Sequence, residues 1–187
     1  RKAGGSSGIH GFLATREFPT IRRLSEALAS EGFSVLAPTL SLGVNRRRQS
    51  VACEAIHTHS MEQDVAELRS WVRWLAERAG KAPVVIGHSA GGAQLTAMLD
   101  GGRDLEVARA VLVSLSSFGE EQGPEEVGFL RARAATDQAR AADAMYPYSL
   151  SYCKTYVTTP SNLLSYLTWD KARLMFALNG SAVPVTV

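Results

Sequence analysis

Near the middle of the chain, residues 87–91 read Gly-His-Ser-Ala-Gly, between an apolar run at 82–86 and a helical pattern at 90–99. In a tight turn from strand to helix, a serine is held in a strained conformation, and only small residues fit two positions before and after it. Such a turn presents the Ser89 hydroxyl at the sheet edge and points the Ala90 N–H at a developing oxyanion. The segment therefore predicts a nucleophilic serine. The other residues of the turn, which would support it, are Gly87, His88 and Gly91.

Four histidines are candidates for the base that such a serine needs, and all four lie before or within the turn: His10, His57, His59 and His88. His57 and His59 precede an expected helix N-terminus, so either imidazole could line a substrate pocket and act as the base; a packing role is the alternative. Cys53 with these two histidines would make three zinc ligands. The spacing is not a standard one and no fourth ligand is evident, so we expect no metal.

The elements that position Ser89 alternate between helix and strand. Helical spacing of apolar residues predicts helices over residues 18–31, 60–75 and 90–99, the second one opened by a capping box of Ser60 and Gln63. Short apolar runs predict buried strands over 33–38, 82–86 and 108–115. This alternation predicts an α/β fold with a mostly parallel sheet and flanking helices.

Residues 116–180 break this alternation. They contain an amphipathic segment at 125–144, a Tyr-rich turn at 146–148 and a helical pattern at 161–178. We interpret them as an inserted helical cap or lid followed by a crossover helix, and residues 182–187 as a further strand. The candidates in the cap for lining an apolar acyl pocket are Phe118, Phe129, Leu130, Met145, Tyr146, Tyr148 and Tyr152.

The serine turn in this order of elements resembles the nucleophile elbow of the α/β-hydrolase superfamily. A second segment, His10-Gly11-Phe12, is similar to the His-Gly segment that follows the family's third strand. The resemblance covers residues 9–117 and, more loosely, 161–187. It implies a second oxyanion-hole N–H at Phe12, an orienting or structural role for His10 beside Gly11, and hydrolysis of ester or related acyl substrates through an acyl-enzyme on Ser89. It implies no cofactor.

The family order of nucleophile, acid and histidine is not fulfilled in this chain. No histidine follows Ser89, and the strand that usually precedes the acid ends at Val187. The alternative acid position holds Ser116 and Ser117, with glutamates just beyond that we expect to face solvent. We therefore expect a single α/β-hydrolase domain over residues 1–187, incomplete at its C-terminal end, with little or no activity by itself.

The N-terminal segment also departs from the pattern of the α/β-hydrolase family. The strand before His10 should be apolar, but residues 4–8 are all glycine and serine, which weaken a strand. We expect this strand to be short or missing and residues 1–8 to be a linker.

Composition excludes several classes of protein. The 187 residues are 45% hydrophobic and 20% charged, which is typical of a globular domain, and the net charge of +2 predicts no nucleic-acid binding. The basic run at 46–48 is interpreted as a solvated loop. No apolar run is long enough to span a membrane. Two cysteines 100 positions apart predict no disulfide framework and a reducing, cytoplasmic compartment.

The expected partner is a small-molecule acyl substrate, and the sequence leaves the oligomeric state open. Two alternatives to hydrolysis also stay open. One is a non-catalytic binding protein of the same fold that has lost its triad. The other is transfer of the acyl group to an acceptor other than water, with the same fold and nucleophile.

Overall fold

A five-stranded parallel sheet forms the centre of the computed structural model, which describes residues 4–100, 102 and 106–187. Its strand order is β2-β1-β4-β5-β8, and all four strand pairs are parallel. The predicted α/β architecture with a mostly parallel sheet is therefore confirmed. The strands are β1 (Gly5–Ile9), β2 (Ser34–Leu36), β4 (Val84–His88), β5 (Arg109–Val113) and β8 (Val185–Thr186).

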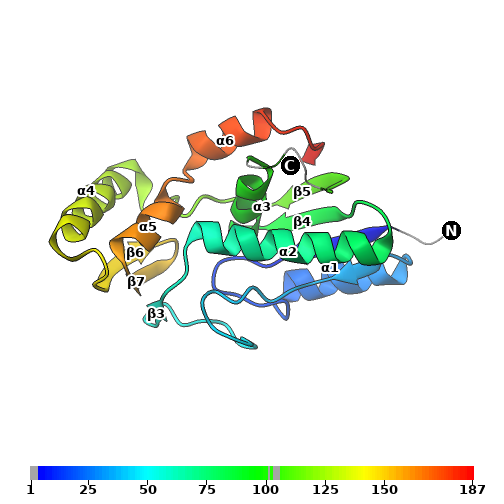
Figure 1. Cartoon of the computed structure of the whole chain (residues 1–187), viewed down its shortest axis with the longest axis horizontal. Coiled ribbons are helices and arrows are strands. Elements are labelled where there is room, and N and C mark those ends of the chain that lie inside the picture. Colours follow the sequence, from blue (N-terminus) through cyan, green and yellow to red (C-terminus); the bar gives the residue numbers. More distant parts are fainter. Residues whose placement is uncertain (1–3, 101, 103–105) are drawn as a thin grey trace.

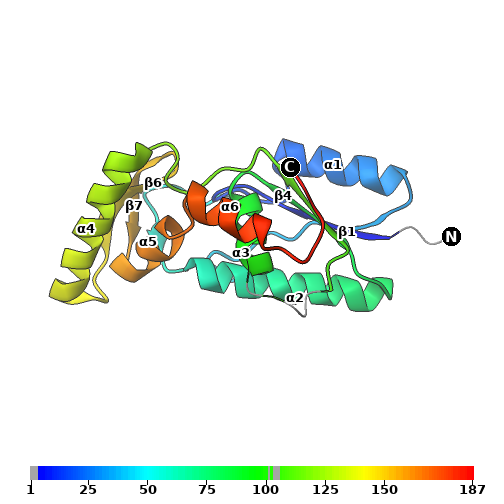
Figure 2. The ribbon, with the colours of Figure 1, turned by 90° about the horizontal axis from the view of Figure 1, so that it is seen from above.

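Helices cover both faces of this sheet, with α1 on one side and α2 on the other (Figure 2). Three of them lie where the sequence predicts helices, and the expected capping box is present, since Ser60 Oγ accepts from the Gln63 N–H and Gln63 Oε1 accepts from the Ser60 N–H. The helix α3 lies beside α2, and α6 packs against α3. The helices around the sheet are α1 (Pro19–Ser30), α2 (Met61–Ala79), α3 (Ala90–Asp100) and α6 (Lys171–Asn179).

The strand β1 corrects the expectation that the strand before His10 is short or missing. Its residues Gly5–Ile9 are all buried, between β2 and β4. A Cβ added at Gly5 would lie 3.2–3.3 Å from the side chains of Leu75 and Ala79 in α2. A Cβ added at Gly8 would lie 3.8 Å from Ile21 in α1. The small residues thus let helices approach both faces of the strand closely. Of the expected linker, residues 1–3 lie outside the described part of the chain.

A second, smaller sheet lies beside the main one, together with α4 and α5, at the left of Figure 1. Its strand order is β3-β7-β6, with β7 antiparallel to β6 and parallel to β3. We call residues 123–167, which contribute most of this unit, the cap segment. The elements are β3 (Ile56–His57), α4 (Gly123–Ala141), β6 (Tyr146–Leu150), β7 (Cys153–Thr158) and α5 (Pro160–Leu167).

Two expectations for the cap segment were wrong. The Tyr-rich segment at 146–148 is not a turn but the start of β6, because its backbone pairs with β7 and Tyr148 is fully buried. The helical pattern at 161–178 forms two helices, α5 and α6, since the Asp170 side chain accepts from the Arg173 N–H and begins a new helix there.

The helix α3, which follows Ser89, is almost wholly buried, with every residue from Ala90 to Leu99 enclosed. It is 11 residues long. Among the described residues, no helix combines the length and the apolar character that crossing a membrane would need.

Candidate active site

Ser89 lies between the end of β4 and the start of α3, as the sequence predicts. Its φ of 54° places it in the left-handed region, which non-glycine residues rarely adopt. The Ser89 N–H donates to the Val113 carbonyl of the neighbouring strand at 2.9 Å, and the Ser89 carbonyl accepts from the Gly92 N–H at 2.8 Å. Sheet and helix therefore hold the strained turn from both sides.

The glycines of the turn are required by close backbone contacts. A Cβ at Gly87 would lie 2.7 Å from the Gly91 carbonyl oxygen and from the Gly92 Cα. A Cβ at Gly91 would collide with the carbonyl oxygens of Ile9 and His10, at the end of β1. These contacts bring the end of β1 directly beside the serine, and a Cβ at Gly11 would in turn lie 3.4 Å from Ser89 Cβ.

Ser89 opens into a pocket of about 310 Å³. Its wall comes from the loop after β1, from the β4–α3 turn and from the cap segment, which contributes Tyr152. Of the cap residues proposed as pocket lining, Phe129 and Met145 are instead exposed to solvent, while Tyr148 and Leu130 are buried in the cap segment. The residues that line the pocket are Gly11, Phe12, Leu13, Ala14, Phe18, Ser50, His88, Ser89 and Tyr152.

Two backbone N–H groups belong to residues close to Ser89, one next to it in the chain and one in the pocket wall. Neither the Ala90 N–H, at the first turn of α3, nor the Phe12 N–H has a hydrogen-bond acceptor within the described residues. The Phe12 ring is held by edge contacts with Phe118 and Tyr152 and lies against Tyr156. Neither N–H group is thus occupied by a hydrogen bond within the described residues.

His10 is fully buried. Its Nε2 accepts from the Leu40 N–H at 3.0 Å, so the ring proton lies on Nδ1, which donates to the Gly11 carbonyl at 2.9 Å. Burial lowers the pKa of His10 to about 4, and the positive charge of Arg47 contributes in the same direction. With its lone pair engaged, His10 cannot act as the base.

His57 and His59 do not line the Ser89 pocket. The His57 ring is buried and stacks on Tyr156 with the ring centroids 3.9 Å apart, and its Nε2 lies 3.1 Å from the Cys53 carbonyl oxygen. Burial lowers the pKa of His57. This packing does not support the hypothesis that either residue is the base for Ser89. It supports the alternative, a structural packing role.

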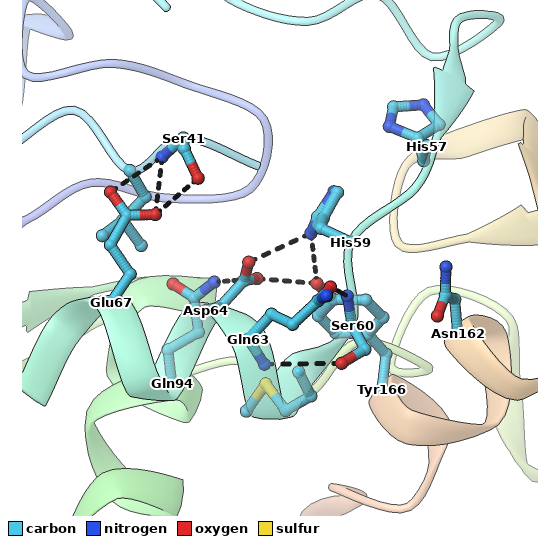
Figure 3. A network of polar contacts seen from close by, with 12 residues as sticks. Ser41, His57, His59, Ser60, Gln63, Asp64, Glu67, Gln94, Asn162 and Tyr166 are labelled. Carbon is cyan, nitrogen blue, oxygen red and sulfur yellow. Dashed lines mark hydrogen bonds and ion pairs between the residues drawn. The ribbon is translucent and has the colours of Figure 1, made fainter. Parts of the chain in front are cut away.

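His59 belongs to a buried polar network that joins the cap segment to α2 and α3 (Figure 3). The Asp64 carboxylate accepts from His59 Nδ1 at 3.1 Å, from the Tyr166 hydroxyl at 2.6 Å and from Gln94 Nε2 at 2.8 Å. On its other side, His59 Nε2 lies 3.3 Å from the Tyr156 hydroxyl. Burial raises the pKa of Tyr166 well above its ordinary value, with the Asp64 charge adding to the effect.

The two cysteines correct another expectation. Cys53 and Cys153 form a disulfide, with Cα atoms 5.3 Å apart. Sequence spacing did not indicate it, because the segment before β3 and the start of β7 meet only in the folded small sheet. Since Cys53 is bonded in this way, it is not available as a zinc ligand. The described residues contain no cluster of three potential metal ligands.

Two interactions near the pocket were not predicted from the sequence. Ser116 Oγ lies 3.1 Å from Ser89 Oγ, because β5 ends beside β4 at the same edge of the sheet. Tyr152, in the two-residue turn between β6 and β7, donates from its hydroxyl to the Phe12 carbonyl. The proximity of Ser116 was detectable from the parallel order of the strands. Tyr152 was a candidate for lining the pocket and lies there, but its bond to Phe12 depends on a pairing that only the fold reveals. Glu120 and Glu121 are exposed, as expected.

His88 lines the pocket beside Ser89, in addition to supporting the turn. Its ring lies 5.7 Å from the Phe18 ring, and its Nδ1 is buried without a hydrogen-bond partner among the described residues. Burial lowers the pKa of His88.

Comparison with known proteins agrees with this geometry. A family model described as "Alpha/beta hydrolase family" matches residues 8–183. A search of curated protein sequences finds no match. Solved structures with the same fold include one from work on LipS and LipT, two metagenome-derived lipolytic enzymes, at 20% identity and a TM-score of 0.61, covering 98% of this chain and 71% of that one.

Two further solved structures share the fold at low identity. The monoacylglycerol lipase of Paleococcus ferrophilus has 17% identity and a TM-score of 0.64, with 97% of this chain and 71% of that one covered. Est1E from Butyrivibrio proteoclasticus, in complex with ferulic acid, has 14% identity and a TM-score of 0.62, with 98% and 67% covered.

Proposed function

Because this chain belongs to the alpha/beta hydrolase family, we propose that it is the nucleophile-bearing part of a serine hydrolase acting on ester or related acyl substrates. The observation that carries the proposal is Ser89 at a φ of 54°, opening into a pocket beside the two unpartnered N–H groups of Phe12 and Ala90. The lipolytic and esterase-type structures with the same fold support an ester substrate.

In the proposed mechanism, Ser89 Oγ attacks the substrate carbonyl carbon while a histidine takes the hydroxyl proton. The N–H groups of Ala90 and Phe12 stabilise the oxyanion, and Gly87, Gly91 and Gly11 allow the close approach that this requires. Protonation of the leaving group releases it and leaves an acyl-enzyme on Ser89, which water then hydrolyses. No cofactor takes part.

The histidine and the acid are proposed to come from polypeptide outside these 187 residues. Within the described residues, His10 has its lone pair engaged, and His57 and His59 are packed away from the pocket. We take residues 1–187 as part of one hydrolase domain and residues 116–180 as a cap insertion with its crossover helix.

The test compares hydrolysis of p-nitrophenyl butyrate by the chain and by Ser89→Ala, at matched folded concentration. The comparison is then repeated in a longer polypeptide that extends past Val187. We expect turnover in the longer protein that Ser89→Ala abolishes. A folded longer protein with no turnover on short and long acyl esters would contradict the proposal.

A second candidate is a non-catalytic binding protein of the same fold. It is favoured by one observation, that within the described residues His10, His57 and His59 are held away from Ser89 and His88, although it lines the pocket, makes no hydrogen bond to the Ser89 hydroxyl. Acyl ligands that bind to the pocket with equal affinity in the wild type and Ser89→Ala, without turnover in the longer protein, would support it. Transfer to an acceptor other than water is distinguished from hydrolysis by product analysis.

A further inference from the structure

Arg47 differs from its two neighbours in the basic run. Arg46 and Arg48 are exposed and have no hydrogen-bond or ion-pair partner within the described residues, as expected for a solvated loop. Arg47 is half-buried, and burial lowers the pKa of its guanidinium, which the nearby Glu67 charge counteracts. The middle residue of the run is therefore not part of a solvated basic patch.

All five N–H donors of the Arg47 guanidinium have acceptors. Nε donates to the Leu40 carbonyl at 2.8 Å, and Nη1 to the carbonyls of Gln49 at 2.8 Å and Leu13 at 3.4 Å. Nη2 donates to the Ala14 carbonyl at 2.7 Å and to His10 Nε2 at 3.3 Å. No donor is left over for a bound anion, so the group acts on the protein itself.

The acceptors lie on segments that form the Ser89 pocket. Leu13 and Ala14 line it directly, and Gln49 precedes the lining residue Ser50. The Val51 N–H also donates to the Leu13 carbonyl, at 3.0 Å, which adds a second tie between the same two segments. Arg47 therefore fastens the loop after β1 to the segment between β2 and β3.

The contact with His10 extends this effect to Phe12. Because Nε2 of His10 accepts from both Arg47 and the Leu40 N–H, the ring carries its proton on Nδ1, which donates to the Gly11 carbonyl. In a trans peptide, the carbonyl of Gly11 and the N–H of Phe12 point in opposite directions. Fixing the Gly11 carbonyl therefore fixes the direction of the Phe12 N–H.

We propose that Arg47 is a positioning residue, which aims the Phe12 N–H at the Ser89 site by holding both the His10 ring and the carbonyls of the loop after β1. This inference rests on the proposed function for its catalytic meaning. Its structural part, the control of the His10 ring position and of the Phe12 amide, does not depend on turnover.

The first test reads the structure alone, by NMR of the ¹⁵N-labelled chain. We compare Arg47→Ala with the matched control Arg48→Ala, which removes the same charge from the same loop. In the wild type and the control, His10 carries its proton on Nδ1 at pH 7. In Arg47→Ala we expect the Leu40 N–H to keep the proton on Nδ1, while the Nε2 signal of His10 shifts because the Arg47 contact is lost and the Phe12 amide shifts and exchanges faster. Methylguanidinium should restore both signals, and methylammonium should not.

The second test reads reactivity in the longer protein. We expect Arg47→Ala to lower kcat for p-nitrophenyl butyrate by about 10- to 100-fold with KM changed by less than about threefold, because a misdirected oxyanion donor weakens transition-state binding. Arg48→Ala should leave both constants unchanged. Arg47→Lys keeps the charge but lacks the planar fork, so it should recover only part of the rate.

The outcomes separate the two proposals. If the wild type has no turnover, the proposed function fails, and the NMR comparison still decides whether Arg47 holds the His10 ring and the Phe12 amide in place. Unchanged signals in Arg47→Ala would overturn the inference, as would a kcat within about twofold of the wild type in an active enzyme. Should Arg47→Ala fail to fold, Arg47→Lys takes its place in the NMR test, and unchanged signals there overturn the inference in the same way.

Discussion

The Tyr152 hydroxyl donates a 3.0 Å hydrogen bond to the carbonyl oxygen of Phe12, although the two residues lie 140 positions apart. This bond joins the turn of the cap segment to the loop that carries the proposed oxyanion donor. Since Tyr152 also lines the pocket, it connects the cap segment to the pocket wall, as does the contact between the Phe12 and Tyr156 rings.

Removing this hydroxyl should affect the site more than the fold. For Tyr152→Phe, which keeps the ring contact with Phe12, we expect unfolding free energy to fall by about 1 kcal/mol or less, because Tyr152 is partly exposed. The rate of ester hydrolysis that depends on Ser89 should fall by about three- to tenfold. Urea unfolding and ester hydrolysis in the longer protein measure the two effects. Tyr146→Phe is the control, since that hydroxyl has no partner within the described residues; equal effects in both variants would contradict the prediction.

The close contacts of the serine turn predict a contrast between two glycines. Gly87→Ala should destabilise the protein by about 1–3 kcal/mol or more, because the new Cβ meets rigid backbone at 2.7 Å. Gly128→Ala, inside α4 with open space around it, should instead stabilise by about 0.5–1 kcal/mol. Denaturant unfolding of the two variants checks the prediction, which fails if they shift the midpoint in the same direction.

The disulfide should be a major source of stability. The Cys53→Ser, Cys153→Ser double variant frees a loop of 100 residues, and chain entropy predicts a loss of about 4–5 kcal/mol. Thiol titration of the unfolded, unreduced chain should detect no free cysteine, since both cysteines are paired. Two reactive thiols in that titration would show that the bond is absent, and a double variant as stable as the wild type would show that it does not stabilise the fold.

Buried His10 predicts a loss of stability in acid. Its pKa in the folded protein is about 4, compared with 6.5 for an exposed histidine. The unfolded chain therefore binds a proton between these two values that the folded chain does not. Stability is fully present above pH 6.5 and falls by up to about 3 kcal/mol as the pH drops through 4.

The experiment is urea unfolding of the wild type and His10→Gln from pH 7 to pH 4. The substitution itself lowers the unfolding free energy at every pH because it disturbs the contacts of the ring. The comparison is therefore made on the slope of unfolding free energy against pH. We expect a shallower slope in His10→Gln, since that residue does not titrate. Parallel curves would mean that His10 is protonated equally in both states.

Local patterns in the sequence predicted the parts of the fold that local physics determines. The turn around Ser89 was identified because its glycines are required within five residues, and α2 because its capping box and apolar stripe are contiguous. The strand β1 was misjudged for a physical reason. Glycine and serine are poor strand formers, but here they let α1 and α2 approach a central strand that backbone pairing holds on both sides.

The remaining errors concern contacts between distant segments. Neither β3 nor the pairing of β6 with β7 has a local signature, and the disulfide depends on that pairing. His57 and His59 were grouped with the site because of their place before α2, whereas their packing is decided by Tyr156 and Tyr166, about a hundred positions away. Such contacts follow from the fold, so the sequence alone did not predict them.

The position of the disulfide also has a topological consequence. The bond between Cys53 and Cys153 closes a covalent ring that includes α2, β4, α3, β5 and α4, with Ser89 inside it. A single protease cut within that ring, including one in the segment between α3 and β5, opens the ring without separating the chain into two molecules. Ser89 and Tyr152, which is next to Cys153, would then stay on one covalent species until the bond is reduced.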